Sequence, residues 1–139
     1  MVTRLRDVER TAAYMRRGGR VDPHAPLVIE IEDMRLKAGL NAREHRMVRA
    51  SRTKRERQTA HWMLLDAKRP PLPVVVRLVR ISPRAFDDDN LQGAFKAIRD
   101  GVADAYGIAD NDKTLIRFEY DAERGKPHQY SVRIEVSPA

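Results

Sequence analysis

The segment "RAFDDDNLQG", residues 84–93, holds the side chains of this chain that are best suited to metal or phosphate chemistry. Three adjacent carboxylates, Asp87, Asp88 and Asp89, stand in a chain whose formal net charge is +7. Two unit charges about 4 Å apart repel each other by roughly 4 kcal/mol at an effective dielectric constant near 20. Capping of a helix N-terminus accounts for one of these carboxylates. The remaining repulsion requires a bound cation or side chains that point apart.

A second acidic cluster follows about twenty residues later, where "ADND" places Asp110 and Asp112 in a loop. Each cluster taken alone is ordinary turn chemistry. Carboxylates from a strand end, a helix start and a following loop can also converge on one hard divalent cation. Mg²⁺ suits such a site, because it binds a few carboxylates, waters and the phosphate oxygens of a substrate. The two clusters together therefore indicate metal-assisted phosphodiester chemistry.

These segments carry a family resemblance. "DDDN", "KAIRD" and "GIADNDKTLI" resemble the core pattern of the RusA-type crossover junction endodeoxyribonucleases. That pattern is Asp-x-Asp-Asn, then a Lys, an Asp four residues on, and a Gly with an acidic pair. The resemblance covers about residues 26–136. The residues that match it are Asp87, Asp89, Asn90, Lys96, Asp100, Gly107, Asp110 and Asp112.

The resemblance implies a Mg²⁺-dependent endonuclease, with Mn²⁺ as a substitute ion, that resolves Holliday (four-way) junctions in DNA recombination and repair. It implies a homodimer in the cytoplasm of a bacterium, encoded by the bacterium or by a phage. The implied metal ligands are Asp87, Asp89 and Asp112, with Asp110 as the alternative to Asp112. Lys96 is the implied catalytic lysine. Asn90 and Asp100 are the implied supporting residues.

Two positions depart from the family pattern. The family lysine usually stands three residues after the Asn, where this chain has Gly93, and Lys96 is reached only through an insertion of about three residues. The acidic pair is usually adjacent, whereas Asn111 separates Asp110 from Asp112 here. Asp112 is preferred because its distance to the strand that follows fits the pattern better.

The charge balance independently points to nucleic acid. The chain contains 27 Lys and Arg against 20 Asp and Glu, and such an excess favours contact with phosphates. Between residues 43 and 57, "REHRMVRASRTKRER", basic residues far outnumber glutamates, which is unusual for a merely solvated helix. We expect DNA contacts in this stretch from Arg49, Arg52, Lys54 and Arg55.

Other compositional features exclude further classes of protein. The absence of cysteine excludes disulfides, thiolate metal sites and cysteine nucleophiles. No apolar run reaches the length of a membrane span, and the first residues lack the apolar core of a secretion signal, so we expect no membrane contact. The four histidines show no mutual spacing typical of a metal site. Trp62, on the apolar half of a helix, is predicted to be core rather than a base-stacking residue.

The elements that must position these residues can be predicted from periodicity. Helices are expected at residues 3–17, at about 43–67, ended by Pro70 and Pro71, and at about 89–105. The last has a buried stripe of Leu91, Phe95, Ile98 and Val102, with Asp89, Lys96 and Asp100 on the opposite face. A strand is expected at residues 26–33, with its polar side in water, and another at residues 72–82, buried on much of both faces. Two more strands are expected at residues 114–122 and 128–136, joined as a hairpin.

The predicted fold class is therefore α/β, of the mixed α+β kind: one mixed sheet packed against helices, RusA-like, in the order α-β-α-β-α-β-β. Residues 1–139 are expected to form a single RusA-like endonuclease domain, with residues 1–25 as an N-terminal helical extension. Two other functions remain open. One is a nucleic-acid-binding protein of the same fold with impaired catalysis, and the other is a calcium-binding or purely structural acidic loop.

Overall fold

A computed structural model describes residues 25–37, 45–84 and 91–139 of the chain. In chain order its elements are β1 (Leu27–Glu32), α2 (Arg46–Asp66), β2 (Val74–Ser82), α3 (Leu91–Ala94), α4 (Lys96–Tyr106), β3 (Ile116–Arg124) and β4 (Ser131–Pro138). The helix predicted at residues 3–17, and with it nearly all of the proposed extension at 1–25, lies outside the described residues.

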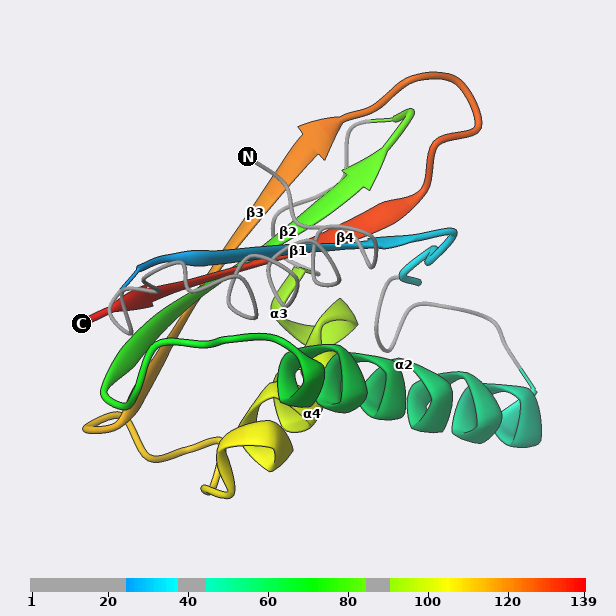
Figure 1. Ribbon diagram of the computed structural model, residues 1–139. Coiled ribbons are helices and arrows are strands. Elements are labelled where there is room, and N and C mark those ends of the chain that lie inside the picture. The colour runs from blue at the N-terminus through cyan, green and yellow to red at the C-terminus, as the bar shows by residue number, and fades with distance from the viewer. Residues whose placement is uncertain (1–24, 38–44, 85–90) are drawn as a thin grey trace.

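The four strands form a single sheet in the order β1-β4-β2-β3. Strands β1 and β4, and β4 and β2, pair antiparallel, whereas β2 and β3 pair parallel. The helices α2, α3 and α4 all lie on one face of this sheet (Figure 1). A single mixed sheet covered by helices confirms the predicted α+β class and places β2 in the interior, paired on both sides.

The predicted hairpin between the last two strands is wrong. Strand β3 pairs with β2 alone and β4 lies on the other side of β2, so the connection at residues 125–130 passes the end of β2. The backbone N–H of Gly125 donates to the carbonyl of Ser82, the last residue of β2, at 2.8 Å. The Val-rich β2 lies inside the sheet, where Val74, Val76, Leu78, Val79 and Ile81 are buried. Arg77 is an exception to the predicted burial, since its side chain is 34% exposed on the face that carries the ion pairs.

The predicted apolar stripe of the third helix is confirmed, because Leu91, Phe95, Ile98 and Val102 are all buried. The helix is nevertheless broken: Phe95, with φ −90° and ψ 1°, separates α3 from α4. The described order is consequently β-α-β-α-α-β-β. Gly107, with φ +67°, ends α4 in the left-handed conformation that favours glycine.

Helices α2 and α4 pack closely through a small-residue contact. A Cβ atom added to Gly101 of α4 would lie 2.3 Å from the backbone oxygen of Arg57 and 3.0 Å from the Cβ of Ala60, both in α2. Ala60 is fully buried. Arg57 also forms an ion pair with Asp104 of α4, with Nε–Oδ2 at 2.7 Å. The position of α4 relative to α2 is therefore set by backbone proximity and by this ion pair.

The opposite face of the sheet carries an ion-pair network that crosses three strands. Arg77 of β2 contacts Asp121 of β3 and Glu135 of β4, and Arg133 of β4 contacts Glu135 and Glu123. Since three carboxylates outnumber the two guanidinium groups, this network carries a net charge of −1.

Two further expectations concern the polar side of β1 and contact with a membrane. The prediction that the polar side of β1 lies in water is wrong for Glu30, which is buried and accepts a hydrogen bond from the hydroxyl of Ser131 at 3.0 Å. Within the described ranges, no helix is both long and apolar enough to cross a membrane.

Candidate nucleic-acid and metal site

The acidic stretch at residues 87–89 lies outside the described residues. Asp87, Asp89 and Asn90 fall within the gap at 85–90, and the structure resumes at Leu91, the first residue of α3. What the structure does describe is the surroundings of α3. Two pockets meet this short helix, and its consecutive residues Gln92 and Gly93 line different ones.

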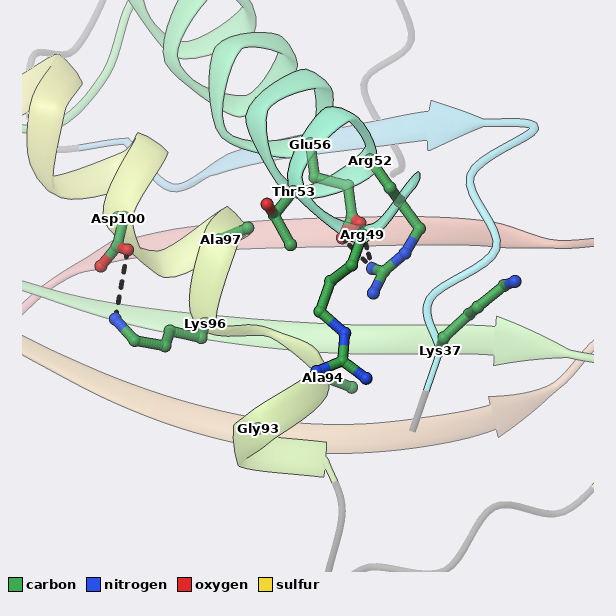
Figure 2. Close-up of a pocket in the computed structure, with 10 residues that line it drawn as sticks. All are labelled: Lys37, Arg49, Arg52, Thr53, Glu56, Gly93, Ala94, Lys96, Ala97 and Asp100. Carbon is green, nitrogen blue, oxygen red and sulfur yellow. Dashed lines mark hydrogen bonds and ion pairs between the residues drawn. The ribbon is translucent and has the colours of Figure 1, made fainter. Parts of the chain in front are cut away.

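We call the first the α2 pocket. It has a volume of about 530 Å³ and lies between α2, α3 and α4, next to the segment that follows β1 (Figure 2). Four cationic and two anionic side chains line it, so its lining carries a net charge of +2. The charged residues are Lys37, Arg49, Arg52, Lys96, Glu56 and Asp100, and the uncharged ones are Thr53, Gly93, Ala94 and Ala97.

Two of the predicted DNA-binding residues, Arg49 and Arg52, enter this pocket. Arg49 extends from α2 towards Ala94 of α3 (Figure 2). The Nη1 of Arg52 donates to both carboxylate oxygens of Glu56 at 3.0 Å, and the side chain of Glu56 is only 3% exposed. Arg52 therefore neutralises a buried carboxylate within α2 as well as facing the pocket.

Lys96 and Asp100 are brought together at one end of the α2 pocket. The Nζ of Lys96 lies 3.4 Å from Oδ2 of Asp100, while the lysine side chain is 68% exposed. Asp100 also lies 3.9 Å from Nη1 of Arg57. Among the described residues the contact given for Lys96 is this i, i+4 pair, and such pairs contribute about 0.2–0.5 kcal/mol. Lys96 can therefore exchange its partner for a phosphate oxygen at little cost.

We call the second pocket the β3 pocket. It has a volume of about 420 Å³ and lies beside the edge strand β3. Polar, cationic and aromatic side chains share its lining, which comes from α3, α4, the loop after α4 and β3. These residues are Gln92, Arg99, Asp110, Asn111, Lys113, Ile116, Arg117, Phe118 and Tyr120.

Arg99 connects the parts of the β3 pocket. Its Nε lies 3.1 Å from Oδ2 of Asp110, and its Nη1 donates to the hydroxyl of Tyr120 at 3.2 Å. Its guanidinium carbon lies 5.9 Å from the centre of the Phe118 ring. Arg99 and Asp110 thus form an ion pair at the pocket, although among the described residues Arg99 Nε has no hydrogen-bond partner.

The two alternative acidic residues of the loop have different surroundings. Asp112 uses Oδ1 to accept hydrogen bonds from the backbone N–H of Thr114 at 3.1 Å and from its hydroxyl at 2.5 Å. The Thr114 hydroxyl is the main reason that the pKa of Asp112 is lowered. This is the arrangement of an Asx turn leading into β3. Asp110, by contrast, lines the β3 pocket together with Gln92. Gln92 follows Asn90 of the acidic motif by two residues.

The remaining predicted DNA-binding residues, Lys54 and Arg55, lie elsewhere. Both are exposed and neither lines the two pockets. They share the outer face of α2 with Trp62, whose side chain is 61% exposed. The prediction that Trp62 is core is therefore wrong. The neighbouring Leu64 and Ala60 provide the buried contacts of this half of the helix instead.

Sequence patterns missed several pocket residues because they come from separate elements. Lys37 follows β1, Arg99 lies on α4, and Lys113 and Arg117 flank the start of β3. A signal was available for the aromatic pair alone: in "RFEY" the two-residue period puts Phe118 and Tyr120 on one face of the strand. Nothing in the sequence indicates that Arg99 reaches that face.

The chemistry of the β3 pocket is compatible with a hard cation. Asp110, Asn111 and Gln92 offer the oxygen atoms that Mg²⁺ prefers. The described part of the chain contains no group of three His, Asp or Glu side chains arranged to hold a metal ion. Two of the three proposed ligands, Asp87 and Asp89, lie outside that part.

No protein-family model, no curated protein and no solved structure matches this chain. The resemblance to the RusA family therefore depends on the motif residues themselves.

Proposed function

We propose that this protein is a metal-dependent, RusA-like endonuclease that acts on branched DNA, with the four-way junction as its substrate, and that it does so as a homodimer. Its role would be in DNA recombination and repair in the cytoplasm of a bacterium. The proposal rests on one observation above all: Asp110 and Gln92 line the β3 pocket together with three cationic side chains. Gln92 follows the Asp-x-Asp-Asn motif by two residues. Carboxylates and cations in one pocket suit a metal and a phosphodiester.

Each residue has a role under this proposal. Asp87, Asp89 and one carboxylate of the loop, Asp112 or Asp110, hold Mg²⁺. The contacts around Asp110 favour it over Asp112, because the Asp112 oxygen that accepts from Thr114 already stabilises the turn. A bound Mg²⁺ would polarise the phosphodiester and lower the pKa of a bound water.

The cationic side chains would position the DNA. Arg99 forms an ion pair with Asp110, while Lys113 and Arg117 offer charge at the rim of the β3 pocket. In the α2 pocket, Lys37, Arg49 and Lys96 supply positive charge, with Lys96 able to stabilise the charge that develops on the phosphate. Asn90 and Asp100 support the site, Asp100 by holding Lys96 at 3.4 Å until substrate binds.

The proposal is tested by cleavage of a synthetic four-way junction with Mg²⁺ or Mn²⁺. Asp89→Asn should abolish cleavage, and Asp110→Asn should reduce it more than Asp112→Asn does. Asp33→Asn, which changes an exposed carboxylate directly after β1 that lines neither pocket, is the matched control and should cleave like the wild type. Equal cleavage by Asp89→Asn and the wild type would refute the assigned site.

The alternative function is a DNA-binding protein of this fold that does not cleave. The observation that favours it is Gly93, which stands at the family's lysine position and lines the α2 pocket without a side chain. Salt-dependent binding of junctions by the wild type, with no cleavage in either metal, would establish this alternative. The third function, a structural acidic loop, predicts no DNA affinity at all.

A further inference from the structure

The outer face of α2 combines an exposed indole with positive charge. Trp62 is 61% exposed, and the neighbouring Leu65 is 39% exposed. At about 100° per residue, Trp62 lies about 20° from Arg55 and about 40° from Gln58 around the helix axis, and Arg55 is about 10 Å away along it. Lys54 borders the same face, and all of these side chains are exposed.

This face is separate from both pockets. Around the helix axis Trp62 lies about 140° from Arg49, which enters the α2 pocket. The acidic residues of α2 are Glu56, which is buried against Arg52, and Asp66 in the last turn. Asp66 lies about 40° from Trp62 around the axis and about 6 Å from it along the axis, at the C-terminal end of this face. The outer face is therefore basic on the N-terminal side of Trp62, where Arg55 and Lys54 lie.

We propose that the outer face of α2 binds single-stranded DNA, with an unpaired base stacked on Trp62 and the adjacent phosphates held by Arg55 and Lys54. The indole offers a flat π surface to any base, and stacking of this kind combined with basic side chains is how single strands are bound without sequence preference. A base inside a duplex is already stacked on both sides. Trp62 would therefore select the unpaired bases that branched DNA exposes.

His61 restrains the indole for this purpose. The two rings contact edge to face, with centroids 5.3 Å apart and an interplanar angle of 75°. His61 is itself partly buried, on the side of the helix that faces Asp104 of α4. A contact at one edge of Trp62 limits its rotation and lowers the entropy that a stacked base must offset.

Charge argues against a second copy of this chain as the occupant. The middle of α2 lies near Glu56, so an antiparallel pairing of two α2 helices through this face brings Lys54 and Arg55 against the same residues of the second copy. A parallel pairing does the same. A polyanion removes this repulsion, whereas a second copy creates it.

The chain offers a direct probe, since Trp62 is its only tryptophan. Titration with an oligothymidylate in EDTA, where no cleavage occurs, should quench the intrinsic tryptophan fluorescence, and a blunt duplex of equal length should quench it far less. Binding of a labelled oligothymidylate is then compared among variants. Trp62→Ala should weaken binding about tenfold, within the range of one lost base stack, and Trp62→Phe should restore part of it.

The charged residues and the control have different expected effects. Arg55→Gln should weaken binding and reduce the slope of log affinity against log salt, which Trp62→Ala leaves unchanged because no charge is lost. Leu65→Ala, an exposed apolar residue of the same face that cannot stack, should bind like the wild type. Equal affinity of Trp62→Ala, Leu65→Ala and the wild type would overturn the inference. So would a change of oligomeric state in Trp62→Ala without a change of DNA affinity.

This inference rests on the DNA-binding part of the proposed function and not on cleavage, so the two can fail separately. If the wild type cleaves junctions but oligothymidylate does not quench Trp62, the inference is wrong and the proposed function stands. If oligothymidylate binding depends on Trp62 but no junction is cleaved, the inference stands and the nuclease function is wrong.

Discussion

Arg57 of α2 and Asp104 of α4 form a bidentate ion pair, with Nε–Oδ2 at 2.7 Å and Nη2–Oδ1 at 2.9 Å. The pair joins two helices across 47 residues of sequence. Arg57 belongs to the basic stretch that the sequence assigns to DNA, but its guanidinium is engaged within the protein. A basic residue in such a stretch can therefore serve the fold.

Asp104→Asn should destabilise the protein at neutral pH by about 1 kcal/mol or less, the usual range for a largely exposed pair. The hydrogen bond from Arg57 is the main reason that the pKa of Asp104 is lowered. A carboxyl whose pKa is lowered by folding stabilises the protein above its unfolded value of about 4, and the effect is lost as the pH falls through the folded value. The difference in unfolding free energy between wild type and variant, measured in urea, should therefore be present at pH 7 and shrink below about pH 4.

Asp66→Asn is the matched control for this prediction. It removes an exposed carboxylate from the last turn of α2 without touching the contact with α4. A difference for Asp104→Asn that persists unchanged at low pH would show that the ion pair is not its origin.

Gly101→Ala should destabilise the protein, although alanine is the better helix former by about 1 kcal/mol. The added Cβ would lie 2.3 Å from the backbone oxygen of Arg57, and a backbone atom cannot move aside as a flexible side chain can. Overpacking of this kind costs about 1–3 kcal/mol. Thermal unfolding measures the change, with Ser51→Ala on the exposed face of α2 as control. An unchanged or higher melting temperature for Gly101→Ala would contradict the close packing of α2 on α4.

Glu56→Ala should be more destabilising than a typical surface change in α2, by about 2–3 kcal/mol. The variant removes the carboxylate to which Arg52 Nη1 donates two hydrogen bonds, and loss of charged hydrogen bonds at a side chain that is only 13% exposed is costly. Replacing both residues, as in Arg52→Met with Glu56→Leu, should recover most of the loss. Unfolding free energies of the single and double variants, compared as a cycle, measure this coupling, and additive effects would contradict it.

The elements whose residues alternate or repeat regularly could be predicted from the sequence. The stripe Leu91, Phe95, Ile98 and Val102 is buried as its spacing requires, although the spacing does not reveal the break at Phe95. The pairing of strands could not be predicted in the same way. Strands β3 and β4 are close in sequence and have turn residues between them, yet β3 pairs with one edge of β2 and β4 pairs with the other. Which partner a strand takes depends on the whole sheet and not on its nearest neighbour in sequence.

The candidate site shows the same limit at the level of side chains. Composition draws attention to the basic stretch as a whole, but residues of one helix point in all directions. Arg49 enters a pocket, Arg57 holds α4, and Arg55 lies on the outer face. Trp62 was misassigned for a related reason, since a run of apolar residues, "WMLL", continues round the helix past its buried face. Only the packing partner decides which of them is covered.

Lys96→Met separates catalysis from stability most clearly. Lys96 is 68% exposed and its contact with Asp100 contributes at most a few tenths of a kcal/mol, so the unfolding free energy should change by less than about 0.5 kcal/mol. If Lys96 stabilises the charge that develops on the phosphate, junction cleavage should fall about 100-fold or more. Binding of the junction in EDTA should weaken only slightly, because one of several phosphate contacts is lost.

Lys126→Gln, which removes an exposed charge in the connection between β3 and β4, is the control. Cleavage by Lys96→Met at the wild-type rate would show that Lys96 does not replace the lysine missing at Gly93.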